Sequence, residues 1–185
     1  MRVIAGCYRR RLLKEADPRT TRPTTDKNRE MVFNVLGQFF DGGRALDLYA
    51  GTGAMGIEAL SRGCVHATFV DRDPAAIRTI EDNLNALGVS RAAVKVLKTD
   101  AEPWLSKESG PPYDYIFLDP PYALGAVPEA IRIIATRRML SPTGVIVAET
   151  DRMFDNASDI AGIALFREIP AGNTKFAFYH WGVPS

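Results

Sequence analysis

The sequence predicts an α/β fold of the Rossmann-like type, in which helices cover both faces of a doubly wound, mostly parallel sheet. Three observations lead to this prediction. From residue 44 onward, short apolar runs typical of strands alternate with stretches of helical periodicity. The connections between these segments are short, which favours parallel strands joined by right-handed crossovers. A glycine-rich turn, Gly51-Thr52-Gly53-Ala54-Met55-Gly56, follows the first predicted strand and opens a helix.

The elements of the main domain each have a local signal. Apolar runs at residues 45–49, 66–71, 93–97, 115–119 and 145–149 predict five parallel strands. Helices are predicted from the glycine-rich turn to Arg62, from Pro74 to Leu87 with Gly88 closing the helix, and over about residues 127–138. Residues 163–169 and 175–181 flank a turn at residues 170–173. They predict a C-terminal antiparallel hairpin at one edge, which makes a seven-stranded sheet.

The first 40 residues are predicted to form a small extension ahead of this domain. Apolar pieces at residues 2–5 and 12–13 bracket a basic turn, a pattern that predicts a β-hairpin. Thr24 or Thr25 can cap a following helix, which Asp41-Gly42-Gly43 would end. Its predicted apolar face consists of Met31, Val32, Val35, Leu36 and Phe39. The predicted division is therefore residues 1–40 for the hairpin and helix extension and residues 41–185 for the main domain.

Composition and charge narrow the class of protein. The chain has 185 residues, 46% of them hydrophobic and 24% charged, as expected for one globular domain. No apolar run approaches the roughly 18 residues of a membrane span, and residues 1–6 lack the apolar core of a signal peptide. Cys7 and Cys64 lack metal or redox spacing. We therefore expect a cytoplasmic monomer with two free thiols, no membrane partner and no metal site.

The formal net charge of +1 conceals an uneven distribution. Residues 1–29 contain nine basic and three acidic side chains, a net charge of +6, which leaves −5 for the rest of the chain. A basic arm on a mildly acidic domain predicts a polyanionic partner bound mainly through the arm. The alternative is a solvated tail with chance charge. The side chains expected to contact such a partner are Arg9, Arg10, Arg11 and Lys14.

The glycine-rich turn has two interpretations. With Asp71 lying 20 residues beyond Gly51, it matches the G-x-G-x-x-G fingerprint of NAD(P)-dependent oxidoreductases. Asp47, four residues before Gly51, also gives the D-x-x-x-G-x-G pattern typical of methyltransferases that use S-adenosylmethionine. A carboxylate at this position suits a ligand with an ammonium and a sulfonium group, whereas it would repel a pyrophosphate. We therefore expect S-adenosylmethionine as the cofactor.

Acidic residues at the ends of consecutive predicted strands support this choice, because open α/β sheets bind ligands at that edge. Asp71 is expected to accept hydrogen bonds from ribose hydroxyls, and Asp100 is expected near the adenine amino group. Asp73 either assists Asp71 or caps the helix at Pro74. The predicted cofactor-binding residues are Asp47, Tyr49, Gly51, Thr52, Gly53, Asp71, Arg72, Asp100, Ala101, Arg22 and Thr24.

The tetrapeptide Asp119-Pro120-Pro121-Tyr122 follows the fourth predicted strand and carries the strongest chemical signal. Two prolines prevent the strand from continuing and stiffen the loop, from which an acid and an aromatic ring project. This segment resembles the (D/N)PP(Y/F) motif of methyltransferases that modify exocyclic or amide nitrogens. We expect Asp119 and the Pro120 carbonyl to accept the two N–H bonds of an amino group, and Tyr122 to stack on its ring. An Asp-Pro turn after a core strand is the structural alternative.

Several further segments together resemble the RsmD family, bacterial enzymes that methylate a guanine N2 of 16S rRNA in the small ribosomal subunit. They are residues 2–6, the element Arg22-Pro23-Thr24-Thr25-Asp26-Lys27-Asn28-Arg29-Glu30 with Phe33-Asn34, residues 49–53, residues 56–63 and residues 119–122. The resemblance covers nearly the whole chain. Arg10 replaces the usual glycine of the family's basic loop, and Asn28 replaces a more usual aliphatic residue.

The resemblance implies a class I S-adenosylmethionine-dependent methyltransferase with 16S rRNA as its partner. Asp119, Pro120 and Tyr122 would then be the catalytic residues, orienting the amino lone pair rather than acting as a strong base. Because no second recognition domain is evident, an assembled small subunit is the expected substrate. A DNA adenine-N6 methyltransferase, an NAD(P)-dependent oxidoreductase and a non-catalytic RNA-binding factor are the alternatives.

Overall fold

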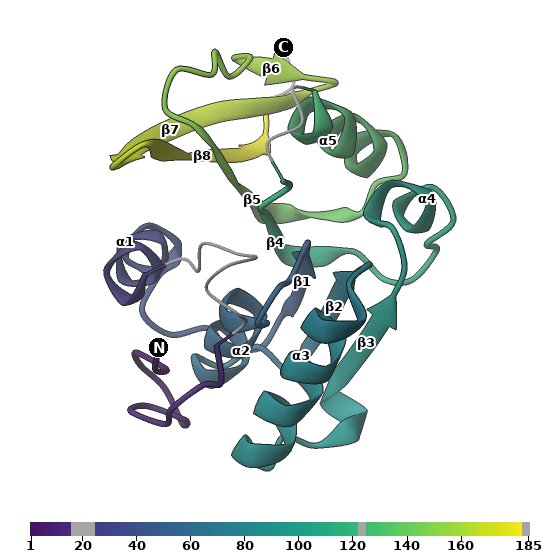
Figure 1. Cartoon of the computed structure of the whole chain (residues 1–185). Helices are drawn as coiled ribbons and strands as arrows, with labels where there is room; N and C mark the ends of the chain where they lie inside the picture. Colours follow the sequence, from purple (N-terminus) through teal and green to yellow (C-terminus); the bar gives the residue numbers. More distant parts are fainter. Residues whose placement is uncertain (16–24, 122–124, 183–185) are drawn as a thin grey trace.

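The computed structural model describes residues 1–15, 25–121 and 125–182 and contains one mixed sheet flanked by helices (Figure 1). The helices are α1 (Asp26–Leu36), α2 (Ala54–Ser61), α3 (Pro74–Leu87), the 3₁₀ turn η1 (Arg91–Ala93), α4 (Ala101–Leu105) and α5 (Ala126–Thr136). The strands are β1 (Arg44–Leu48), β2 (His66–Asp71), β3 (Val94–Lys98), β4 (Tyr113–Leu118), β5 (Leu140–Asp151), β6 (Asp159–Ile160), β7 (Ile163–Ala171) and β8 (Thr174–Trp181).

The sheet has the order β3-β2-β1-β4-β5-β8-β7-β6. The first five strands in this order are parallel, and β8, β7 and β6 follow as antiparallel neighbours. The strand order reverses direction between β1 and β4, which is where open α/β sheets form a ligand crevice. The doubly wound fold with a C-terminal antiparallel hairpin at one edge is therefore confirmed.

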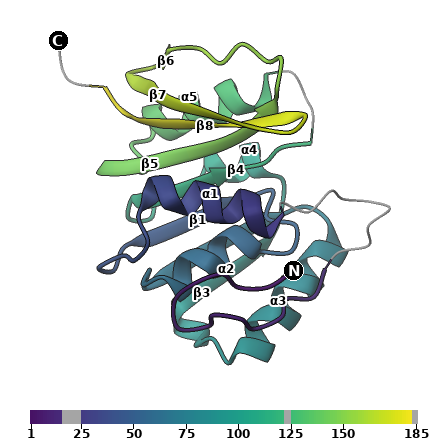
Figure 2. The ribbon, with the colours of Figure 1, turned by 90° about the vertical axis from the view of Figure 1, so that its left-hand side faces the viewer.

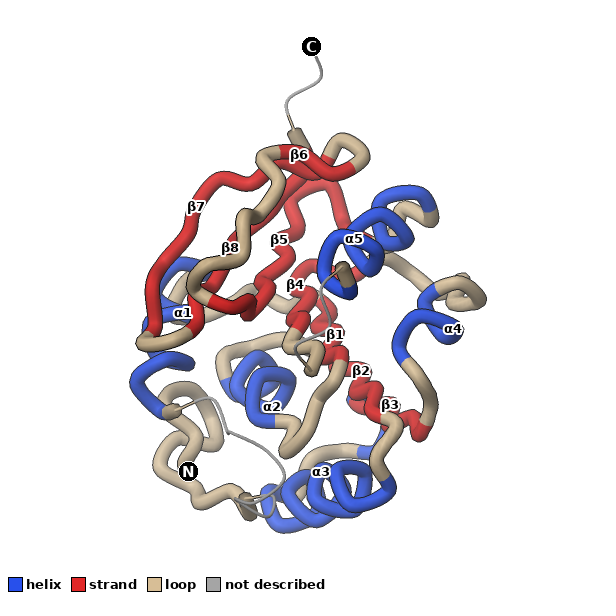
Figure 3. The backbone as a smooth tube through the Cα atoms, turned by 45° about the horizontal axis from the view of Figure 1, so that its top comes forward, coloured by secondary structure: helices blue, strands red, loops and turns tan. Residues whose placement is uncertain are grey.

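Helices lie on both faces of this sheet, with α1, α2 and α3 on one side and α4 and α5 on the other (Figure 3). Each face has its own apolar core. Val32 and Phe33 of α1 pack with Ile57 of α2, Ile80 of α3 and the sheet residue Phe117 in the first core. The second core joins α4 and α5 to the opposite face of the sheet and to β6 and β7. The two layers fix the carboxyl ends of the central strands.

Local signals place several elements well. The predicted bounds of β2 and α3 are those of the structure. Asp73 accepts a hydrogen bond from the Ala75 N–H at 2.8 Å, so it caps α3, and Gly88 ends the helix at a φ of 70°. Thr25 similarly caps α1 by accepting from the Asn28 N–H at 3.2 Å. Thr24, the other proposed cap, lies outside the described residues.

Other predictions about local structure are wrong. Helix α1 ends at Leu36 rather than near Asp41, because Gly37 adopts a φ of 120° and its N–H closes the last turn on Phe33. Phe39, placed on the apolar helix face, instead lies beyond the helix and is 70% exposed. Among the described residues the sheet has eight strands rather than seven, because residues 159–160 pair with the start of β7. Helix α4 was not predicted, since its five residues are too few to show a helical period.

The predicted N-terminal hairpin is reduced to one antiparallel bridge between Arg2 and Leu12. Backbone hydrogen bonds from Val3 to Arg11, from Arg10 to Val3 and from Leu13 to Met1 join its two sides, and α2 accepts further N–H groups of this segment. The N–H groups of Ile4 and Ala5 donate to the Glu58 carboxylate at 2.9 and 3.0 Å, and the Cys7 N–H donates to the Ser61 carbonyl at 2.8 Å. The N-terminal segment therefore lies along α2 and α3 rather than standing free (Figure 2).

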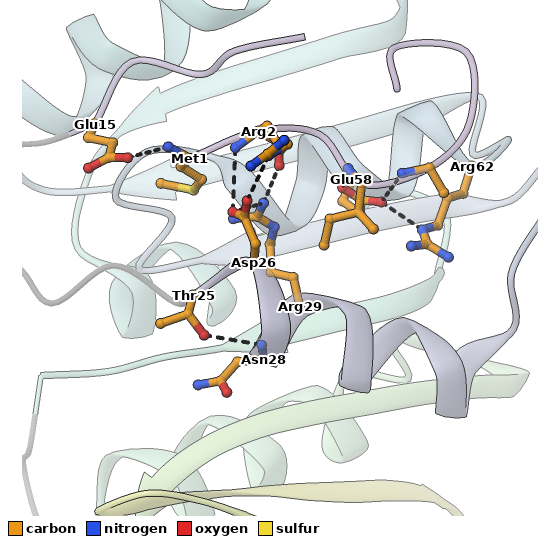
Figure 4. Close-up of polar contacts among 11 residues, drawn as sticks. Met1, Arg2, Glu15, Thr25, Asp26, Asn28, Arg29, Glu58 and Arg62 are labelled. Carbon is orange, nitrogen blue, oxygen red and sulfur yellow. Dashed lines mark hydrogen bonds and ion pairs between the residues drawn. The ribbon is translucent and has the colours of Figure 1, made fainter. Parts of the chain in front are cut away.

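Buried charged side chains of the domain bind the backbone of this segment (Figure 4). Arg62 donates to Glu58 at 2.8 Å, and both side chains are almost completely buried. Arg29 of α1 is also buried and donates to the Arg2 carbonyl and to Asp26. Burial, opposed by the charges of Asp26 and Glu58, lowers the pKa of Arg29. Since Val3 and Leu13 pack in the same core as Phe33, residues 1–15 are part of the folded body.

Candidate active site

A cavity of about 930 Å³ opens at the carboxyl ends of β1, β2, β4 and β5. It brings together most of the residues that the sequence predicted for cofactor binding and catalysis. Those that line it are Asp47, Tyr49, Gly51, Thr52, Asp71, Arg72, Asp100, Ala101, Asp119 and Pro120. Gly53 is not among the lining residues. Arg22, Thr24 and Tyr122 lie outside the described residues.

The glycine-rich loop forms one wall of the cavity. Gly51 and Gly53 have φ angles of 55° and 75°, a region that favours glycine. Tyr49, at the end of β1, has a φ of 60°, a conformation that is uncommon for a residue with a side chain and turns the chain sharply into the loop. A Cβ at Gly56 would lie 2.4 Å from the Phe69 ring. The third glycine thus allows α2 to pack closely on β2, as the motif requires.

Asp47 lies beneath this loop and is buried. Its carboxylate accepts the Gly56 N–H at 2.8 Å and thereby joins β1 to α2. Burial raises the pKa of Asp47 to about 8, and the nearby Asp119 and Asp71 carboxylates act in the same direction. A cationic ligand in the cavity would favour the ionised form of this acid.

Asp71, at the end of β2, orders the loop between β1 and α2. One carboxylate oxygen accepts the Gly51 N–H at 2.9 Å, and the other accepts the Asp73 N–H at 2.9 Å. Each carboxylate oxygen has a second lone pair, so Asp71 retains two acceptor positions for ligand hydroxyls. This geometry fits the predicted role at the ribose.

The third acid, Asp100, follows β3 at the N-cap position of α4 but makes no capping hydrogen bond with its side chain. It is exposed on the cavity wall with Glu102. Burial raises the pKa of Tyr49, and the Glu102 and Asp100 carboxylates add to that shift. The three side chains thus lie near one another in the cavity wall.

Asp119 lies directly after β4, which is next to β1 on the side away from β2 and β3. Its carboxyl reaches into the cavity, where solvent has access to it, yet protein surrounds it closely enough that burial raises its pKa to about 7. The Glu149 carboxylate contributes to this shift. Glu149 was not among the residues predicted for the site, although it ends the fifth predicted strand and lines the cavity. Its position at the same sheet edge as the other acids was the available signal.

The charge of the cavity distinguishes between the two cofactor classes. Eight lining residues are Asp or Glu, and Arg72 is the one basic residue among those described. Such a lining favours a cationic ligand and disfavours a dinucleotide pyrophosphate. Within the described part of the chain, no cluster of acid, histidine or cysteine side chains has the arrangement of a metal site. None of the described helices is long and apolar enough to cross a membrane.

The four basic residues predicted to contact a polyanion lie on the N-terminal segment, away from the cavity lining. Arg9 and Arg10 are exposed. Arg11 donates to the Ala86 carbonyl at 2.6 Å, and Lys14 pairs with Asp82 at 2.6 Å, so these two are partly engaged by α3. Asn83 links this segment to the cavity loop, since its amide donates to the carbonyls of Lys14 and Thr52 at 3.2 and 3.1 Å.

Comparisons with known proteins extend over nearly the whole chain. The family model described as Conserved hypothetical protein 95 matches residues 1–180. YlbH of Bacillus subtilis (strain 168), named as a candidate rRNA methyltransferase, is 44% identical over 183 residues, which cover 97% of this chain and 98% of that protein. Ribosomal RNA small subunit methyltransferase D of Escherichia coli (strain K12) is 33% identical over 179 residues, with 97% and 89% covered.

A solved structure is also similar over nearly the whole chain. The structure of YhhF from Escherichia coli, described as a candidate methyltransferase, superposes with a TM-score of 0.86 at 32% identity and covers 98% of both chains. The similarity therefore includes the N-terminal segment as well as the cavity.

Proposed function

Because this chain belongs to the RsmD family, whose model matches residues 1–180, we propose that it methylates the exocyclic N2 amino group of a guanine in 16S rRNA. S-adenosylmethionine is the methyl donor. The observation that carries this proposal is the position of Asp119-Pro120 in one acidic cavity with the glycine-rich loop. An acceptor for an amino group and a site for a cationic cofactor therefore share the same space.

The residues present fit S-adenosylmethionine. When bound, it supplies an electrophilic methyl group on a sulfonium. Asp71 would hold the ribose hydroxyls, Asp100 would lie near the adenine amino group, and Asp47 would offset the positive charge of the methionine part. The N–H groups of a glycine-rich loop and the surrounding carboxylates are suited to this ligand, because they combine close backbone approach with negative charge.

Asp119 is assigned an orienting role. The lone pair of the guanine amino group is delocalised into the ring, so the nitrogen is a poor nucleophile. A hydrogen bond from one N–H to the Asp119 carboxylate and a second to the Pro120 carbonyl favour a pyramidal nitrogen and direct its lone pair. The carboxylate also stabilises the positive charge that develops on nitrogen. Tyr122 is proposed to stack on the base that enters the cavity.

The substrate is proposed to be the assembled or assembling small ribosomal subunit. Arg9 and Arg10 are exposed on the N-terminal segment and are available for phosphates, whereas the cavity itself is acidic. Phosphate contacts position a protein but carry no sequence information. We therefore assign RNA positioning to residues 1–40 of a monomer and catalysis to residues 41–185, with selectivity supplied by the shape of the subunit.

Transfer of tritiated methyl groups from S-adenosylmethionine tests this proposal. The acceptors are small subunits from cells lacking the modification, naked 16S rRNA and duplex DNA. We expect label in N2-methylguanine of the small subunits. Label in N6-methyladenine of DNA would contradict the proposal and favour the DNA methyltransferase alternative. Equal transfer to naked rRNA would contradict the requirement for assembly.

A further inference from the structure

Glu149 lies beside Asp119 on the same face of the sheet. Strands β4 and β5 are parallel, and their ladder continues to the pair Leu118 and Ala148. The next residue along each strand is Asp119 and Glu149, respectively. Adjacent strands lie about 4.8 Å apart, so two side chains that project from neighbouring positions on one face come close together. Both residues line the cavity.

Strand β8 orients the Glu149 side chain. Glu149 lies opposite Phe176 in the antiparallel β5–β8 ladder, which places Thr174 diagonally beside Glu149 on the same face. The buried Thr174 hydroxyl donates to Glu149 Oε1 at 2.8 Å. A carboxylate can accept several hydrogen bonds on its two oxygens, so the bond from Thr174 does not exhaust the acceptor capacity of the group.

Guanine has two adjacent hydrogen-bond donors that two neighbouring carboxylates, Asp119 and Glu149, can accept. Its Watson–Crick edge presents the N1–H donor next to the N2 amino donors, whereas adenine presents an acceptor at N1. Bases taken out of a helix are read by hydrogen bonds along this edge. We propose that the Glu149 carboxylate accepts a hydrogen bond from the guanine N1–H while Asp119 accepts one from an N2–H, so that Glu149 selects guanine. This inference depends on the proposed function, since it assigns the specificity of the same site.

The base analogue 2-aminopurine distinguishes selection of guanine by Glu149 from a general effect of Glu149 on activity. It keeps the N2 amino group but has an unprotonated N1, which is an acceptor. A carboxylate at position 149 rejects it, because two acceptors then face each other. The amide of Glu149→Gln can donate to that N1. We therefore expect Glu149→Gln to reduce the ratio of kcat/KM for guanine over 2-aminopurine at least tenfold, mainly by gaining activity on 2-aminopurine.

The experiment uses small subunits reconstituted with 16S rRNA that carries guanine or 2-aminopurine at the methylated position. The full-length protein is compared with Glu149→Gln and with Asp155→Asn, which removes one exposed carboxylate from the loop after β5. The ratio is expected to be unchanged in Asp155→Asn. Thr174→Val, which removes the orienting hydroxyl, is expected to lower transfer to guanine more than transfer to 2-aminopurine.

The outcomes distinguish the inference from its premise. An unchanged ratio in Glu149→Gln, or an equal loss on both substrates, with guanine still methylated by the unaltered protein, would overturn the role of Glu149 alone. Failure of the unaltered protein to methylate guanine would overturn the proposed function and this inference with it. If Glu149→Gln does not fold, as judged by its melting temperature, Thr174→Val provides the test. An unchanged ratio of kcat/KM for guanine over 2-aminopurine in Thr174→Val would then overturn the role of Glu149.

Discussion

The Gly51 N–H donates to the Asp71 carboxylate at 2.9 Å, so the end of β2 fixes the loop that follows β1. The predicted ribose-binding acid is therefore also a structural part of the glycine-rich loop. The two roles are compatible, because a carboxylate oxygen that accepts one backbone N–H has a lone pair left for a ligand.

Replacement of Asp71 is expected to weaken cofactor binding. Asp71→Ala removes both the acceptors for the ribose and the hydrogen bonds to Gly51 and Asp73. We expect the Kd for S-adenosylmethionine, measured by calorimetry, to rise by about 10- to 100-fold. Asp41→Ala, which removes an exposed acid before β1, serves as the control and should leave the Kd unchanged. An unaltered Kd in Asp71→Ala would refute the ribose assignment.

Asp119 is expected to affect turnover rather than cofactor affinity. Asp119→Ala should lower kcat by about 10²- to 10⁴-fold, because orientation and charge stabilisation at the amino group are lost. The Kd for S-adenosylmethionine should change little. If kcat falls and the affinity for S-adenosylmethionine falls with it, Asp119 instead maintains the shape of the cavity.

The pH dependence of activity follows from the raised pKa of Asp119, about 7 in the unliganded protein. The ionised carboxylate is the hydrogen-bond acceptor, so kcat/KM for the RNA substrate should rise with pH and level off above about 7. In Asp119→Asn the rise should disappear. A profile that is flat in the unaltered protein between about pH 6 and 8 would contradict this assignment.

Asp47 is expected to make folding stability depend on pH. Burial raises its pKa from 3.8 to about 8, so between these values Asp47 is protonated in the folded state but ionised in the unfolded state. The unfolded state then binds fewer protons, and the free energy of unfolding falls as pH rises, by up to about 1.4 kcal/mol per pH unit. Urea unfolding without cofactor, measured at several pH values, should show that the free energy of unfolding falls less steeply with pH in Asp47→Asn than in the unaltered protein. Equal slopes in both proteins would show that Asp47 is ionised when folded.

The buried pair of Glu58 and Arg62 is expected to hold the N-terminal segment in place. Glu58→Ala leaves the Arg62 charge buried without its carboxylate and removes the acceptor for the Ile4 and Ala5 N–H groups. Unfolding measurements should show a loss of about 3–5 kcal/mol. Glu129→Ala breaks an exposed pair on α5 and should cost about 0.5 kcal/mol or less. A similar loss of unfolding free energy in Glu58→Ala and Glu129→Ala would contradict a role for Glu58 in holding the N-terminal segment.

RNA engagement should depend on the exposed arginines of the N-terminal segment. Replacing Arg9 and Arg10 by alanine is expected to reduce the salt dependence of binding. The slope of log K against the logarithm of salt concentration should fall by about 0.7 for each phosphate that is no longer neutralised. Arg11→Ala should have a smaller effect, since its guanidinium already donates to the Ala86 carbonyl. Binding titrations at several salt concentrations measure these slopes. An unchanged slope in the double variant would leave the segment as a structural element only.

Local signals account for what could be predicted from the sequence. Asp73, Pro74 and Gly88 define α3 because capping and proline geometry depend on neighbouring residues. The acids at the strand ends meet in one cavity because parallel strands bring their carboxyl ends to one edge.

Long-range pairing accounts for what could not be predicted. The hydrogen bond between Thr174 and Glu149 depends on the register of β5 and β8, which pair in antiparallel orientation across the sheet. Arg29, counted in the basic arm, is buried, and its guanidinium donates hydrogen bonds to Asp26 and to the Arg2 carbonyl. The net charge of the arm therefore overstates what is available to RNA, and only the folded structure reveals which arginines are exposed.

The most direct test of the central claim is the N2-methylguanosine content of 16S rRNA, measured by mass spectrometry after digestion to nucleosides. It compares cells lacking this protein with the same cells carrying the unaltered chain or Asp119→Ala at equal protein levels. We predict that the modified nucleoside decreases when the protein is absent, returns with the unaltered chain and does not return with Asp119→Ala. An N2-methylguanosine content that is the same with and without the protein would contradict the account.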